Sequence, residues 1–234
     1  MSITSWSEWF DRAAKTFEDP RMKIAYYSNA KTGTPYSRRA VLATMRHIWD
    51  KLKPRPSHII LDVGCGVGYF TQVYSKKVKQ VIGVDIAPNM IKSAYELNPK
   101  GFFLVSRADV LCFKSKQFDR IFSYGVTQYM ANDKAVESML DEILSLIKPN
   151  GRILVGDILE PIENSPAGFY KKKTVKGKRW WPKTLDHDLT KFYVPKEFFI
   201  RYCKKHNLSC RFFNQKLSGR HIPTPRYDVV IEFN

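Results

Sequence analysis

The sequence predicts an α/β fold in which a seven-stranded, mostly parallel sheet carries helices on both faces. Two observations lead to this prediction. Short apolar runs typical of buried strands alternate with segments of helical apolar spacing along the chain. The first strand also ends in a glycine-rich turn that leads directly into a helix. Strands joined by helices in this way pair in parallel through right-handed crossovers.

The boundaries of the elements follow from the apolar runs and the residues that interrupt them. Pro88 favours a helix start, because its missing N–H leaves no intrahelical bond unmade. Asn132 or Asp133 caps a later helix, and the run 148–151 (KPNG) ends it. The expected strands are 58–63, 80–84, 102–106, 118–124, 152–157, 208–214 and 227–233. The expected helices are 6–18, 36–52, 67–77, 88–97, 132–147 and 195–206.

The segment 59–70 (IILDVGCGVGYF) is the most informative part of the sequence. A buried strand ends there, and glycines follow at every second position, Gly64, Gly66 and Gly68. Glycine lets a ligand lie against the peptide groups, and the free amides at a helix start favour an anionic group. The next strand ends in Asp85, a carboxylate placed to accept hydrogen bonds from a ribose diol. The sequence therefore predicts a Rossmann-like core that binds a nucleoside-containing cofactor.

The spacing of the loop separates two kinds of cofactor. The dinucleotide fingerprint GxGxxG would need a glycine where this chain has Tyr69. Asp62 suits the ammonium group of a cofactor with an amino acid tail better than it suits a pyrophosphate. The loop resembles motif I of the class I S-adenosylmethionine-dependent methyltransferases, and 81–90 (VIGVDIAPNM) resembles their next motif. The resemblance runs from about 58 to 160, and more loosely to the C-terminus. It points to the small-molecule type, whose domain is similar to the methyltransferase domain families 11 and 25.

The resemblance implies which residues hold S-adenosylmethionine and its product S-adenosylhomocysteine. Asp62 would orient the amino group, directly or through water, and Asp85 would bind the ribose hydroxyls. Asp109 would accept from the adenine amino group, although a helix cap would look identical. The remaining contacts implied for the cofactor come from Gly64, Cys65, Gly66, Gly68, Ile86, Val110, Ser123 and Tyr124.

Aromatic residues near the N-terminus offer a lid for the same site. Tyr27 and Tyr36 could cover the cofactor, and Arg38 could meet its carboxylate. Core packing and turn chemistry explain these residues almost equally well, so both interpretations stay open.

Charge is the second informative property of the chain. A formal net charge of +17 over 234 residues indicates an anionic partner, which is nucleic acid, an anionic small molecule or carbohydrate, or a membrane surface. The alternative is that the charge serves solubility alone. The sequence has no apolar run of about eighteen residues and no visible secretory signal, so a cytoplasmic protein without a membrane span is expected. The four cysteines have no metal-binding spacing, and no metal site is expected.

A long insertion, 159–194, follows the fifth strand and is expected to bind the acceptor. It mixes basic side chains with tryptophan, so an anionic group and a stacked ring could both be held there. The candidates are Lys173, Arg179, Trp180 and Trp181. A solvated loop whose tryptophans pack on the core is the alternative.

Methyl transfer from a sulfonium is an in-line displacement, so the protein mainly supplies alignment and exclusion of water. A hydroxyl or amine acceptor also needs a base, and the sequence identifies none clearly. Tyr124, His187 and His221 are catalytic candidates by location, and Asp157 at the end of the fifth strand is a further one.

The sequence predicts a single domain, 1–234, with four parts. These are a helical cap or lid at 1–56, a cofactor-binding core at 57–158, the acceptor-binding insertion at 159–194, and a C-terminal helix with the last two strands at 195–234. The first hypothesis is a monomeric or homodimeric methyltransferase that acts on an O or N atom of a small anionic acceptor, such as a phosphorylated or carboxylated sugar. An RNA methyltransferase and a non-catalytic partner subunit are the alternatives.

Overall fold

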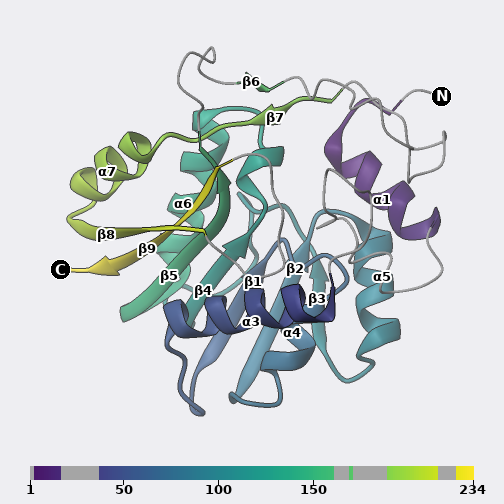
Figure 1. Cartoon of the computed structure of the whole chain (residues 1–234). Coiled ribbons are helices and arrows are strands. Elements are labelled where there is room, and N and C mark those ends of the chain that lie inside the picture. Colours follow the sequence, from purple (N-terminus) through teal and green to yellow (C-terminus); the bar gives the residue numbers. More distant parts are fainter. Residues whose placement is uncertain (1–2, 17–36, 161–168, 171–188, 216–224) are drawn as a thin grey trace.

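A computed structural model describes residues 3–16, 37–160, 169–170, 189–215 and 225–234, which form a seven-stranded sheet flanked by helices (Figure 1). The strands of the sheet are β1 (Ile59–Val63), β2 (Gln80–Asp85), β3 (Phe102–Val105), β4 (Phe118–Tyr124), β5 (Ile147–Leu159), β8 (Leu208–Asn214) and β9 (Arg226–Phe233). The helices are α1 (Trp6–Thr16), α3 (Arg38–Leu52), α4 (Tyr69–Tyr74), α5 (Pro88–Leu97), α6 (Asp133–Leu146) and α7 (Lys196–Lys205), with a 3₁₀ turn, η2 (Thr127–Tyr129).

The strand order is β3-β2-β1-β4-β5-β9-β8, and the first five strands of this order are parallel. β9 runs antiparallel to both β5 and β8. The predicted α/β fold with a mostly parallel sheet is therefore confirmed. A short ribbon of β6 (Phe169–Tyr170) and β7 (Lys191–Phe192) was not predicted, because strands of two residues leave no periodic pattern to read.

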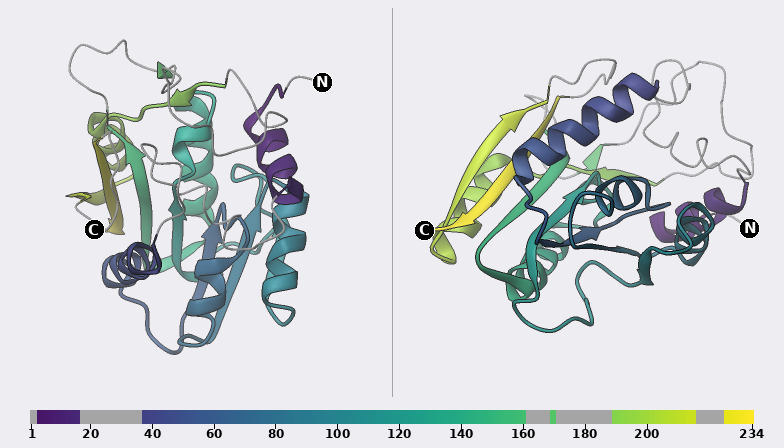
Figure 2. Two further views of the ribbon diagram at one scale, coloured as in Figure 1. Left: turned by 45° about the vertical axis from the view of Figure 1, so that its right-hand side comes forward. Right: turned by 90° about the horizontal axis from the view of Figure 1, so that it is seen from below.

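Helices cover both faces of the sheet, as the right-hand view of Figure 2 shows with α3 on one side and α6 and α7 on the other. On the first face Met45, Ile48 and Leu52 of α3 pack with Phe122 and Leu154. On the second face the buried side of α6 packs on the apolar residues of β1 and β4. The two layers bury the central strands on both sides, which explains their nearly continuous apolar sequences.

The β3 edge of the sheet is less covered than the rest. The connection 106–117 from β3 to β4 forms no helix, so no crossover helix lies over this end of the second face. Phe102 and Leu104 are therefore 56% and 48% exposed, whereas Phe103 on the other side of the strand is buried beside α5. None of the helices in the described ranges is long and apolar enough to cross a bilayer.

Two leucines, one on β5 and one on the edge strand β3, provide a test of the layer assignment. Leu154 is fully buried between β5 and α3, so Leu154→Ala is expected to lower the free energy of unfolding by about 2–5 kcal/mol. Leu104→Ala removes the same atoms from an exposed position and is expected to cost less than about 1 kcal/mol. Urea denaturation of the two variants measures the difference, and equal losses would contradict the described packing.

Candidate functional site

The glycine loop between β1 and α4 adopts the conformation that its sequence requires. Gly64, Gly66 and Gly68 have φ values of +80°, +54° and +71°, a region that favours glycine. The amides of Gly64 and Cys65 both donate to the Val84 carbonyl, at 2.8 and 2.9 Å, so the loop is fixed to the end of β2.

The three glycines serve different purposes. A Cβ at Gly64 would lie 2.2 Å from the Val126 side chain, and one at Gly68 would lie 2.5 Å from the Phe103 ring. A Cβ at Gly66 would meet nothing within 4 Å, and Gly66 lines the cavity beside the loop. Gly64 and Gly68 thus permit close packing of the protein on itself, whereas Gly66 leaves room for a ligand.

Asp85 at the end of β2 joins the two loops that border the cavity. Its Oδ2 accepts from the Gly66 amide at 2.8 Å, and its Oδ1 accepts from the Ala87 amide at 2.9 Å. Burial raises the pKa of this carboxyl, although the hydrogen bonds from backbone amides favour its ionised form. Since the carboxylate lines the cavity, its geometry fits the predicted role of accepting ribose hydroxyls.

Asp62 lies behind the loop instead of in the cavity wall. Its side chain is buried and accepts a hydrogen bond of 2.8 Å from Thr71 Oγ1 of α4. Burial raises the pKa of Asp62 to about 7, with the Thr71 hydrogen bond acting in the opposite direction and the charge of Asp85 adding to the rise. A nearby ammonium group would favour the ionised form of such a carboxyl.

The cavity has a volume of about 480 Å³ and opens at the carboxyl ends of β1, β2 and β4. The structure brings to its wall seven residues that the sequence singled out: Gly64, Cys65, Gly66, Asp85, Ile86, Asp109 and Tyr124. Ligands of open α/β sheets bind at this edge, so the position of the cavity agrees with the predicted cofactor site.

Two other predicted cofactor residues, Ser123 and Val110, do not line the cavity with their side chains. Ser123 is buried, and its hydroxyl points to the Met139 sulfur of α6, so its side chain faces the core. Val110 is 55% exposed. Asp109 forms a bidentate ion pair with Arg107, which lowers the pKa of Asp109, and both residues border the cavity. Asp109 is therefore held by a salt bridge and does not cap a helix.

Several predicted residues fall elsewhere. Arg38 lies in the first turn of α3 and borders a separate surface hollow on the outer side of that helix. The lid tyrosines, the acceptor-binding residues of the insertion and two catalytic candidates lie outside the described residues. These are Tyr27, Tyr36, Lys173, Arg179, Trp180, Trp181, His187 and His221.

The sequence did not identify the aromatic wall of the cavity. Trp6 and Phe10 of α1 pack against Tyr129 of η2, with ring centroids 4.8 and 4.9 Å apart. α1 is held over the site because both carboxylate oxygens of Asp11 accept hydrogen bonds from Asn89 at the start of α5. The apolar spacing of 6–18 predicted the helix, but nothing local showed where it would pack.

A buried polar network behind Tyr124 was also missed. Asp228 of β9 is fully buried and accepts hydrogen bonds from His47 Nε2 of α3, from Gln215 Nε2 at 2.6 Å and from the Asp157 amide at 2.8 Å. Gln215 Nε2 also donates to the Tyr124 hydroxyl at 2.8 Å. This network ties Tyr124, one of the two catalytic candidates in the described residues, to a histidine and a carboxylate that are distant in sequence.

Asp157, the further catalytic candidate, is held in an ion pair. It adopts a φ of +58° and forms an ion pair of 3.0 Å with Arg226. Among the described residues no group of histidine, cysteine and carboxylate side chains could hold a metal ion.

Comparison with known proteins agrees with this geometry. Residues 61–155 match a methyltransferase domain model, and 5–101 match a model of protein-L-isoaspartate(D-aspartate) O-methyltransferase. A 2-methyl-6-phytyl-1,4-hydroquinone methyltransferase of Synechocystis sp. is 32% identical over 126 residues, which is 52% of this chain and 39% of the relative. A malonyl-[acyl-carrier protein] O-methyltransferase of Serratia marcescens is 27% identical over 119 residues, 49% of this chain and 46% of the relative. The chain thus spans less than half the length of either relative.

Solved structures show the same fold at low sequence identity. A phosphoethanolamine N-methyltransferase 1 of Haemonchus contortus, in complex with phosphoethanolamine and S-adenosylhomocysteine, has a TM-score of 0.68 and 13% identity, covering 97% of this chain and 48% of that one. The PH0226 protein of Pyrococcus horikoshii has a TM-score of 0.64 and 17% identity, covering 93% and 100%. Residues 61–155 form a domain of the class I S-adenosylmethionine-dependent methyltransferase type. The cofactor of this class is S-adenosylmethionine, and the open space over Gly66 beside Asp85 fits it.

Two alanine substitutions in the glycine loop should separate ligand binding from folding. Gly66→Ala places a methyl group in the open space over the loop, so the affinity for S-adenosylhomocysteine should fall at least tenfold while stability falls by about 1–2 kcal/mol. Gly68→Ala should destabilise the fold by more than this, because its methyl group overlaps the Phe103 ring. Calorimetric titration and thermal denaturation measure both quantities. Loss of stability without loss of affinity in Gly66→Ala would contradict the assignment.

The pKa of Asp62 predicts how cofactor affinity depends on pH. If the ionised carboxylate pairs with the amino group of the cofactor, affinity for S-adenosylhomocysteine should fall up to tenfold per pH unit below about 7. The apo protein should show the reverse trend, since a raised pKa means that stability present at low pH is lost as pH rises through 7. Asp62→Asn should abolish both dependences. Affinity that is flat with pH in the unmodified protein would rule out the charge pair.

Proposed function

We propose that the chain transfers the methyl group of S-adenosylmethionine to an O or N atom of a small, anionic acceptor. Suitable acceptors are a phosphorylated or carboxylated sugar or another biosynthetic intermediate of that size. One observation carries the proposal. A single cavity runs from Gly66 and Asp85 to the aromatic wall of Trp6, Phe10 and Tyr129, so it has a polar cofactor end and an apolar end for an acceptor.

The residues around the cavity have distinct tasks under this proposal. Asp85 holds the ribose, Gly66 admits the methionine part, and Ile86 with Asp109 borders the adenine. The carboxylate of Asp62 attracts the amino group of the cofactor's methionine part. The backbone groups of Val110 and Ser123 supply the remaining contacts to the cofactor. When bound, S-adenosylmethionine supplies an already activated methyl group. The protein then has to align the acceptor and exclude water. The packed aromatic rings of α1 and η2 help to exclude water from this end of the cavity.

Two observations support a small acceptor. The relatives include enzymes named for a phytyl hydroquinone and for phosphoethanolamine. The described cavity wall carries few charged side chains, with Asp85, Arg107 and Asp109 at the cofactor end. The anionic part of the acceptor would therefore be held by the insertion 159–194, through Lys173 and Arg179 with the rings of Trp180 and Trp181.

Proton removal from the acceptor, where it is needed, falls to a group near the aromatic end. The hydroxyl of Tyr124 is oriented by Gln215, which Asp228 and His47 support, so this network is the favoured candidate within the described residues. His187 and His221 remain candidates from the sequence. An RNA acceptor is the alternative, and the net charge of +17 is the observation that favours it.

Methyl transfer into a matched cell extract tests the proposal. We expect label from radioactive S-adenosylmethionine in the small-molecule or glycan fraction, and much less label with Asp85→Asn, because the amide group leaves one acceptor oxygen for the two ribose hydroxyls. Label in nuclease-sensitive RNA would replace the proposal by the RNA alternative. Binding of S-adenosylhomocysteine without label in any fraction would favour a non-catalytic subunit.

A further inference from the structure

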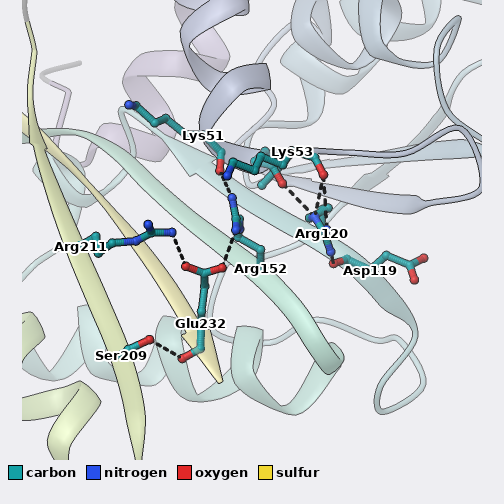
Figure 3. Close-up of polar contacts among 9 residues, drawn as sticks. Lys51, Lys53, Asp119, Arg120, Arg152, Ser209, Arg211 and Glu232 are labelled. Carbon is teal, nitrogen blue, oxygen red and sulfur yellow. Dashed lines mark hydrogen bonds and ion pairs between the residues drawn. The ribbon is translucent and has the colours of Figure 1, made fainter. Parts of the chain in front are cut away.

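Arginine side chains in the described residues fall into two groups. Six have an ion pair or a hydrogen bond to a carbonyl group: Arg12, Arg107, Arg120, Arg152, Arg211 and Arg226. Figure 3 shows three of them at one end of the sheet. There Arg152 and Arg211 share Glu232, and Arg120 bonds carbonyl oxygens at the end of α3. These arginines contribute to the fold.

The second group is concentrated on the outer face of α3. Arg38, Arg39 and Arg46 are exposed, and none of them has a hydrogen bond or ion pair in the described part of the chain. The three side chains border a surface hollow together with Leu42 and Ala43. An α-helix rises 1.5 Å per residue, so the charges extend over about 12 Å of one helix face.

Leu42 lies among these arginines and is 48% exposed. The buried side of the same helix already carries the apolar residues that hold it to the sheet, so packing of α3 on the sheet does not require Leu42. An exposed leucine surrounded by arginines matches a surface that meets anionic head groups and the apolar layer beneath them. The exposed stripe of α3 carries no aromatic ring on which a nucleic acid base could stack.

The position of this face relative to the cavity matters as well. Val41 and Thr44, on the inner side of α3, line the cavity. The arginine face is therefore the outside of the cavity wall, about one helix diameter away. A bilayer in contact with it would lie next to the cavity.

We propose that the outer face of α3, formed by Arg38, Arg39, Leu42 and Arg46, docks the protein on an anionic membrane surface. Arginine guanidinium groups contact the phosphates of the lipids, and Leu42 enters the boundary between head groups and acyl chains. The contact is peripheral and electrostatic, so it weakens as salt is added. This inference goes beyond the proposed function and does not depend on it, since binding can be measured without any acceptor.

The test uses vesicles of phosphatidylcholine, with and without phosphatidylglycerol, in a co-sedimentation assay at low and physiological salt. R39Q/R46Q should lower affinity for the anionic vesicles about twenty-fivefold, since each basic residue near such a surface contributes roughly a factor of five. Arg38 is left unchanged because the sequence analysis predicted a contact between it and the cofactor carboxylate, although the structure places it on this outer face. The matched control, R201Q/K204Q, removes two exposed charges from α7 on the other face and should change affinity less than about threefold.

A second pair of variants tests the apolar contact without changing charge. Leu42→Ala should lower vesicle affinity by about fivefold or more, whereas Ile200→Ala, at a residue 50% exposed on α7, should not. All variants should keep the circular dichroism spectrum and the affinity for S-adenosylhomocysteine of the unmodified protein.

Three outcomes would overturn the proposal. Equal losses in R39Q/R46Q and R201Q/K204Q would mean that net charge alone drives binding. No vesicle binding by the unmodified protein would remove the membrane contact. Vesicle binding unaffected by Leu42→Ala, together with displacement by a single-stranded RNA oligonucleotide through the same arginines, would assign the face to nucleic acid instead.

Discussion

The cofactor site depends on the hydrogen bonds of one carboxylate. Asp85 ends β2 and accepts from the amides of Gly66 and Ala87, so it joins the loop after β1 to the start of α5. The Val84 carbonyl next to it receives the amides of Gly64 and Cys65. The left-handed conformation of the loop is therefore held by the neighbouring strand and not by the loop alone. Burial raises the pKa of Asp85, and backbone donors offset that cost.

The central sheet could be predicted from sequence because its information is local. Each strand is a short apolar run, and each glycine of the loop stands at a fixed distance from it. Asp85 was recognisable for the same reason. The aromatic wall was not, because Trp6 and Tyr129 are brought together by the packing of α1 on α5. The network of His47, Gln215 and Asp228 joins three distant elements, and no spacing in the sequence could indicate it.

Two N-terminal helices turn the edge of a common sheet into an enclosed site. α1 lies beside α5 and contributes rings to the cavity, whereas α3 lies on the sheet and contributes Val41 and Thr44. α3 is fixed through its apolar side and through the Tyr74 hydroxyl, which donates to the Met45 carbonyl at 2.6 Å. The parallel strands thus build the cofactor end of the cavity. The helices α1 and α3, which come before these strands in the sequence, set the shape of the other end. The specificity of the site belongs to the second set, because the first is common to the fold.

The distribution of charge changes how the composition has to be interpreted. A net charge of +17 suggested an anionic acceptor, yet the described wall of the cavity is largely apolar and aromatic. Many of the positive charges have structural tasks, such as Arg120 and Arg152, which bond carbonyl oxygens of Lys51, Leu52 and Lys53. Three of the described arginines without such partners, Arg38, Arg39 and Arg46, lie together on the outer face of α3. Under the proposed docking, the charge on the outer face of α3 affects where the protein binds, whereas the rings inside the cavity contact the acceptor.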